Sequence, residues 1–357
     1  MSRKFNATAF SDKPTLLPRD LPTLTSLRAF AALLVFIYHL EAAGVINFPP
    51  ARLGYTGVAF FFVLSGFVLA WGYRPDFSTS RFYLRRVARV YPSHIAMWLV
   101  VLLLPNPNGS HGPLAAILNL LLLQAWPPSL DYAFSLNGVA WSLSCEIGFY
   151  AAFPLIVRFL GRLNVRAMWI VAFGAFAISS VFVIASSGES ASAAVAALHY
   201  VNPIIRLPEF MLGVVAALAI RSGWRPRWVT GLGVIFLASG GFLFAHDYPS
   251  VNVWATLFYL VLIIGFVLTD IHRPMPFMQL RALIYAGKVS FCFYLAHQIV
   301  ILQIEALKLG AGATVLASLG ASCLLASVLH HVVEIPTFKW LVIRFGPKER
   351  TTETTDS

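Results

Sequence analysis

The chain has 357 residues, of which 58% are hydrophobic and only 11% are charged, and its mean hydropathy is +0.75. A soluble domain would carry about 25% charged residues, so this composition excludes an ordinary soluble enzyme and indicates a polytopic membrane protein. The net charge of +11 is informative mainly through its distribution along the chain.

Ten apolar stretches approach the roughly 20 residues that cross a bilayer as a helix. Their cores are 24–44, 55–73, 88–104, 138–161, 167–187, 200–220, 228–246, 251–270, 284–307 and 312–333. A shorter apolar piece, 114–125, predicts a re-entrant or interfacial helix. We therefore predict an all-α fold with an N-terminal tail (1–22), a transmembrane domain (23–345) and a C-terminal tail (346–357).

The positive residues predict the orientation of these spans, because Lys and Arg favour cytoplasmic segments. With the N-terminus in the cytoplasm, 22 of the 26 Lys and Arg residues fall in cytoplasmic segments. The four exceptions are Arg28, Arg52, Arg206 and Lys308. We expect a multi-pass protein of the bacterial inner membrane with both termini in the cytoplasm. The lipid bilayer is its expected surroundings, nucleic acid is not an expected partner, and the sequence leaves the oligomeric state open.

Two polar residues lie on one stripe of the first span. Arg28 and His39 are eleven positions apart, which on an α-helix corresponds to roughly 16 Å along the axis and about 20° of rotation. Charge inside a bilayer is costly and usually functional. A cation near the cytoplasmic face and an imidazole in the outer half would suit a long anionic substrate lying along this helix.

The predicted orientation gathers further polar residues at two depths. An outer layer could hold His39 with Glu41, Glu146, Trp141, Ser142, Arg206 and Glu209, while Arg85, Arg86, Arg89 and Tyr91 form a basic cytoplasmic mouth. His297 falls in the middle of its span, and Glu334 follows His330 and His331 near the cytoplasm. Structural roles remain open for each residue: a salt bridge for Glu146, a helix start for Arg206 and Glu209, and inside-positive topology for the arginines. We predict no metal site.

Several segments carry a resemblance to a known family. They are Arg28 with His39, YTGVAFFFVLSGF (55–67), RFYLRRVARVYP (81–92), NGVAWSLSCEIGFY (137–150), RLPEFMLG (206–213), GKVSFCFYLAHQ (287–298) and HHVVEIP (330–336). In this order they resemble the acyltransferase-3 family of integral membrane O-acyltransferases over about residues 22–345. The resemblance implies ten membrane helices and acyl transfer from acyl-CoA, most simply acetyl-CoA, to a hydroxyl across the membrane. The implied acceptors are mostly bacterial glycans such as O-antigen, exopolysaccharide and lipo-oligosaccharide.

A mechanism follows as a hypothesis. Arg28, Arg85, Arg86 and Arg89 would bind the phosphates of acyl-CoA, a co-substrate rather than a bound cofactor, because arginine binds phosphate well. His39 would act as general base on the acceptor hydroxyl, since imidazole titrates near neutral pH. Glu146, or next Glu41, would orient the imidazole. Trp141, Ser142 or Arg206 would stabilise the oxyanion.

Other interpretations fit parts of the same pattern. A polytopic glycan transporter would also have many spans and buried charges, although we detect no internal repeat. A sensor or scaffold without catalysis is a third possibility. Within the enzyme class, the acceptor could be an antibiotic or another small molecule, the acyl group could be succinyl or longer, and transfer could be direct or through an acyl-histidine.

Overall fold

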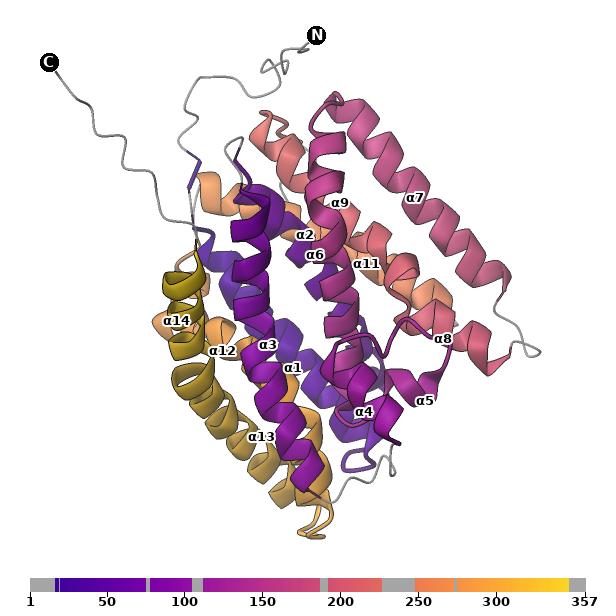
Figure 1. Cartoon of the computed structure of the whole chain (residues 1–357), viewed down its shortest axis with the longest axis vertical. Coiled ribbons are helices and arrows are strands. Elements are labelled where there is room, and N and C mark those ends of the chain that lie inside the picture. The colour runs from indigo at the N-terminus through magenta and orange to yellow at the C-terminus, as the bar shows by residue number, and fades with distance from the viewer. Residues whose placement is uncertain are drawn as a thin grey trace, which may run out of the picture.

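A computed structural model describes residues 17–18, 20–74, 78–104, 112–186, 192–226, 248–272 and 275–346. These residues are almost entirely helical and contain no strand. The helices form one bundle, with α7 at one edge and the α13–α14 helix at the opposite edge (Figure 1). The short helices α4, α5 and α8 gather at one end of the bundle, where α5 contacts both of the others. The predicted all-α class is confirmed.

The helices of the described residues fall into two groups by length. The long helices are α1 (Pro22–Ala42), α2 (Gly57–Trp71), α3 (Thr79–Leu103), α6 (Trp141–Leu160), α7 (Val165–Ala185), α9 (Pro203–Arg221), α11 (Tyr248–His272), α12 (Arg281–Glu305) and α13 (Ala311–Val328). The shorter ones are α4 (Pro113–Leu120), α5 (Leu130–Ala133), α8 (Ala193–Val201) and α14 (Ile335–Phe345). Three short 3-10 turns are η2 (Pro49–Thr56), η3 (Gly138–Ala140) and η5 (Pro276–Gln279), and a π-helical turn, η6 (Leu329–Glu334), joins α13 to α14.

Eight helices within the described residues are long and apolar enough to cross a membrane. The predicted span 88–104 lies in α3, which is not among the eight because four arginines occupy its first half. The predicted span 228–246 lies outside the described residues. The last predicted span, 312–333, is the N-terminal part of a longer continuous helix that runs from Ala311 to Phe345. The chain is a multi-pass membrane protein by these criteria.

Two predicted boundaries differ from the structure. The span expected at 55–73 becomes regular α-helix only at Gly57, because Pro49 and Pro50 begin a 3-10 turn that leads into it. The apolar piece expected at 114–125 forms a helix only over Pro113–Leu120. Leu122 has a left-handed backbone with φ of 56°, which prevents the helix from continuing to residue 125.

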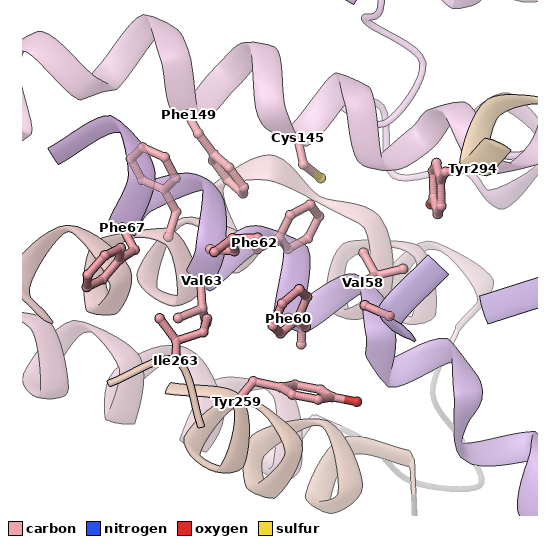
Figure 2. Close-up of a cluster of buried hydrophobic side chains, with 14 of the residues drawn as sticks. Val58, Phe60, Phe62, Val63, Phe67, Cys145, Phe149, Tyr259, Ile263 and Tyr294 are labelled. Atoms are coloured by element: carbon pink, nitrogen blue, oxygen red, sulfur yellow. The ribbon is translucent and has the colours of Figure 1, made fainter. Parts of the chain in front are cut away.

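Helix α2 occupies the centre of the bundle. Its side chains are apolar on all sides, as expected for a helix without a solvent-facing stripe. Figure 2 shows Phe62 directed toward α6, where Phe149 and Cys145 lie, and Phe60 directed toward Tyr259 of α11. The ring centroids of Phe62 and Phe149 are 5.0 Å apart and nearly perpendicular. Polar groups placed around α2 are therefore shielded by a dense aromatic core.

Glycines allow two helix pairs to approach backbone to backbone. A Cβ at Gly66 of α2 would overlap the Phe210 carbonyl oxygen of α9, and a Cβ at Gly213 of α9 would overlap the Val63 carbonyl oxygen of α2. A Cβ at Gly287 of α12 would overlap the Thr25 carbonyl oxygen of α1 in the same way. Small residues at such crossings are typical of membrane helices. The α1–α12 crossing sets the alignment of two histidines described below.

We expect Gly213→Ala to lower the free energy of unfolding by about 3 kcal/mol, because backbone atoms cannot rotate away from the added methyl group. Thermal unfolding in detergent measures the loss. Gly320→Ala is the matched control, since a Cβ at Gly320 has no atom within 4 Å and alanine is the better helix former. Equal melting temperatures for the two variants would contradict this account of the α2–α9 contact.

Candidate functional site

A first cavity, here called the arginine cavity, lies between α1, α2, α3, α6 and α12. It encloses about 850 Å³ of empty space, counting the part open to solvent. Arg28 of α1 and Arg86 and Arg89 of α3 all line it. Apolar residues of α2, among them Val58 and Phe62, form another wall. The structure thus places three cations around one space inside a membrane bundle.

Two of these guanidinium groups are incompletely satisfied. The Nε atoms of Arg28 and Arg86 are buried and have no hydrogen-bond partner among the described residues. Arg86 also lies over two aromatic rings, 5.9 Å from the Phe82 centroid and 5.8 Å from the Tyr150 centroid. Buried donors normally have partners, so these two donors are free to bind an anionic ligand.

The third arginine is anchored by a carboxylate. Arg89 forms an ion pair with Glu334 of the π-helical turn η6, and its guanidinium lies 5.8 Å from the centroid of the Phe291 ring. Glu334 is 1% exposed and also accepts hydrogen bonds from Cys292 Sγ at 3.1 Å and His330 Nδ1 at 2.9 Å. This network fixes where the Arg89 side chain enters the cavity.

The Cys292, His330 and Glu334 ligand atoms lie within 4.8 Å of one another, a separation that a metal ion could bridge. However, Arg89 pairs with the same carboxylate, and its positive charge would repel a divalent cation. The donor set therefore fits an arginine anchor better than a metal centre. A π-helical turn is frequent at functional sites, and here it carries both His330 and Glu334.

A second cavity, here called the histidine cavity, lies beside the last turns of α1. It encloses about 560 Å³ of empty space, again counting the open part. His39 lines it together with Gln298 of α12. Its remaining wall is rich in aromatic side chains: Tyr38, Tyr55, Phe134, Trp141, Tyr200 and Tyr294. It is chemically unlike the arginine cavity, having an imidazole and aromatic rings in place of cations.

Hydrogen bonds assign the tautomer of His39. Its Nδ1 lies 2.9 Å from the Val35 carbonyl oxygen, which can only accept, so Nδ1 carries the proton. His297 Nδ1 likewise donates to the Tyr294 carbonyl oxygen at 2.8 Å, which leaves His297 Nε2 as an acceptor. That Nε2 lies 3.0 Å from His39 Nδ1. The two imidazoles are thus linked, and His39 Nε2 is left as an unprotonated nitrogen.

The two cavities adjoin at a wall, here defined by the residues that line both of them. Among the residues that line them, only Val58 and Tyr294 belong to both. The Tyr294 hydroxyl lies 2.9 Å from Ser142 Oγ and 3.3 Å from the Val139 carbonyl oxygen. Arg28 and His39, which share a stripe of α1, therefore lie on opposite sides of this wall.

Glu146 lies in a different place from the one predicted. It lines the arginine cavity, not the histidine cavity, and accepts a hydrogen bond from Tyr150 at 2.6 Å. The physical reason is its position on α6: it is one turn beyond Ser142 on the same face, about 7.5 Å deeper along the helix than Trp141. His297 takes the place beside His39 that was expected for Glu146.

The other predicted outer-layer residues also separate. Glu41 accepts a hydrogen bond from Arg52 Nε at 2.7 Å on the exposed surface, outside both cavities. Arg206 and Glu209 form a buried ion pair at 3.2 Å, which lines a separate small cavity between α7, α9 and α11. Of the three predicted oxyanion donors, only Trp141 lines the histidine cavity, because Ser142 faces the arginine cavity.

Two residues of the predicted basic mouth point elsewhere. The Arg85 guanidinium lies 6.0 Å from the Phe338 ring of α14, and the Tyr91 hydroxyl donates to the Leu121 carbonyl oxygen at 3.1 Å. Neither lines the arginine cavity. On a helix, adjacent positions such as Arg85 and Arg86 are 100° apart, so one enters the cavity and the other faces α14.

The chain is similar to known acyltransferases. An acyltransferase-domain family model matches residues 21–332. Acyltransferase MdmB of Streptomyces mycarofaciens is 33% identical over 90% of this chain and 92% of its own length. O-acetyltransferase OatA of Staphylococcus aureus is 24% identical over 93% of this chain, which spans 60% of OatA. A putative acetyltransferase of Acidianus two-tailed virus is 24% identical over 77% of this chain. No solved structure matches.

Proposed function

Because the chain belongs to the acyltransferase-3 family of membrane acyltransferases, we propose that it transfers an acyl group from cytoplasmic acyl-CoA to a carbohydrate hydroxyl on the opposite side of the membrane. One observation carries this proposal: the arginine cavity and the histidine cavity lie back to back along α1. The first suits a phosphate-bearing donor, and the second offers a base nitrogen to an acceptor.

The arginine cavity would bind the nucleotide end of the donor. Coenzyme A carries several phosphates, and arginine donates planar, charge-assisted hydrogen bonds to phosphate oxygens. The unpartnered Nε atoms of Arg28 and Arg86 supply such donors. Arg89 adds a third cation, held in position by Glu334. The positive-inside distribution of Lys and Arg supports a cytoplasmic opening for this cavity.

The histidine cavity would perform the chemistry. His39 Nε2 takes the proton of the acceptor hydroxyl while that oxygen attacks the thioester carbonyl. The carbon–sulfur bond then breaks, and the proton passes to the departing thiolate to give free coenzyme A thiol. An acyl-histidine route would use the same nitrogen as the nucleophile. His297 Nε2 accepts the His39 Nδ1 proton, which holds the imidazole in place and stabilises its protonated form, as the acid of a catalytic triad does.

Trp141 is the proposed oxyanion donor, because it is the residue among the predicted donors that lines the histidine cavity, and its indole N–H can donate a hydrogen bond. The aromatic wall supports a carbohydrate acceptor. Tyrosine and tryptophan combine a flat apolar face with a polar edge, which suits a sugar ring that presents C–H groups on its faces and hydroxyls around its rim.

Thiol release tests the proposal. Purified protein given acetyl-CoA and a crude surface-glycan pool should release free thiol only when the pool is present, and the glycan should gain acetyl groups in equal amount. A parallel series with succinyl-CoA identifies the acyl group, and a series with small hydroxyl compounds identifies an acceptor of that class. A transporter would release no thiol with any donor and acceptor, and that result would contradict the proposal.

A further inference from the structure

The wall between the two cavities is defined by the two side chains that they share. Val58 of α2 and Tyr294 of α12 are the two side chains that line both cavities, and they are 5% and 6% exposed. Both lie at the same end of the buried cluster drawn in Figure 2. Val58 is short and rigid, so the ring and hydroxyl of Tyr294 form the movable part of the wall.

Contacts with uncharged groups of other helices hold the Tyr294 ring in place. Ser142 Oγ donates its own proton to the Val139 carbonyl oxygen at 3.1 Å, so the Tyr294 hydroxyl donates either to Ser142 Oγ at 2.9 Å or to the same carbonyl at 3.3 Å. The ring edge meets Phe61, with centroids 5.9 Å apart. Both contacts of the hydroxyl are with neutral groups, and such hydrogen bonds contribute modestly, so the ring can leave this position without breaking an ion pair.

The proposed reaction needs this wall to open. A donor held by Arg28 and Arg86 has its phosphates in the arginine cavity, while His39 lies in the histidine cavity. Val58 and Tyr294, the two residues that line both cavities, stand between them. We propose that Tyr294 is a gate that closes the arginine cavity from the histidine cavity and swings aside for the acyl arm of the donor. The role of this gate in catalysis rests on the function proposed above, whereas its existence as a barrier does not.

Two consequences follow from the position of the gate. When closed, it keeps water of the histidine cavity away from a waiting thioester, and so suppresses the reaction of thioester with water to free acid and thiol. When the ring moves, it also acts on the base, because the Tyr294 ring packs against the His297 ring, with centroids 5.7 Å apart, and His297 contacts His39. Arrival of the acyl arm and alignment of the base are then linked through one turn of α12.

Chemical labelling tests the barrier without any need for activity. Ala42 lines the histidine cavity, and Ala42→Cys in a Cys323→Ala background places a thiol there while removing the exposed native cysteine. The probe is 2-sulfonatoethyl methanethiosulfonate, a small anion that does not cross membranes, applied separately to each face of sealed vesicles. The background protein without Ala42→Cys gives the labelling of the buried cysteines, Cys145 and Cys292.

With Tyr294 present, we expect labelling from one face only. Tyr294→Ala should give labelling from both faces, and Tyr294→Phe, which keeps the ring but loses the hydroxyl, should give an intermediate rate from the second face. Unchanged labelling from the first face shows that the variants are folded. Phe291→Ala is the matched control, because it removes a ring that lines the arginine cavity alone and should leave labelling one-sided.

Labelling from both faces with Tyr294 present would overturn the gate, as would one-sided labelling in Tyr294→Ala. Equal opening by Phe291→Ala would also overturn it, since the effect would then reflect general loosening. In the same preparations, Tyr294→Ala should release thiol from acetyl-CoA several-fold faster than the unchanged protein when no acceptor is present. Absence of thiol release from every variant, with the labelling as expected, would contradict the proposed function while leaving the barrier in place.

Discussion

Replacing His39 by alanine is expected to lower acyl transfer by about 10²- to 10⁴-fold, the usual contribution of a positioned general base. The loss should appear in kcat and not in the KM for the donor. His39 lines the histidine cavity and does not line the arginine cavity, where the donor would bind. The measurement is thiol release from acetyl-CoA in the presence of acceptor, with donor affinity determined separately by equilibrium binding.

His297 provides the control that separates a base from its support. His297→Ala removes the acceptor at 3.0 Å from His39 Nδ1 but leaves the Val35 carbonyl oxygen at 2.9 Å, so His39 keeps its tautomer. We expect a smaller fall in kcat, about tenfold, with little change in KM and partial recovery in His297→Asn, whose amide oxygen can also accept. Normal transfer by a well-folded His39→Ala protein would remove His39 as the base.

The features of the site that depend on the geometry of a single helix could be predicted from the sequence. The spacing of Arg28 and His39 fixed their placement on one stripe of α1, since helix geometry alone determines it. The same is true of the all-α class and of the close packing at Gly66, because apolar length and small residues are local properties. The division of that stripe between two cavities depends on α2 and α12 and could not be read from α1.

Partnerships between helices were not predictable in the same way. Glu146 was expected beside His39 from its estimated depth alone, and depth says nothing about which face of α6 a side chain occupies. The partner of His39 instead comes from α12, whose position against α1 is set by Gly287 at the Thr25 carbonyl oxygen. A signal was present in the sequence: Gly287, Ser290, Tyr294 and His297 follow at spacings of three, four and three, which places them on one face.

Arg85 and Arg86 show the limit of motif reading. Both belong to one basic segment, and the sequence offers no reason to prefer either as a phosphate ligand. The structure directs Arg86 into the arginine cavity and Arg85 toward Phe338 of α14. This separation follows from the packing of α14 against α3, a contact between segments some 250 residues apart in the chain.

Neutralising Arg86 is therefore expected to weaken donor binding far more than neutralising its neighbour. A charge-assisted hydrogen bond contributes about 1.5–3 kcal/mol, so Arg86→Gln should raise the KM for acetyl-CoA by about 10- to 150-fold, and Arg28→Gln should do the same. Arg85→Gln is the matched control, with the same change in net charge at the next position, and its KM should stay within about threefold of the unchanged protein because exposed charges contribute little.

A donor without phosphates shows whether the effect comes from phosphate binding. Acetyl-pantetheine carries the thioester but lacks the nucleotide, so it should be a poor donor for the unchanged protein and should lose nothing further in Arg86→Gln. The same fold-loss for both donors would mean that Arg86 supports the bundle or the chemistry instead. Equal effects of Arg85→Gln and Arg86→Gln on acetyl-CoA would assign the basic segment to topology alone, because only one of the two side chains reaches the cavity.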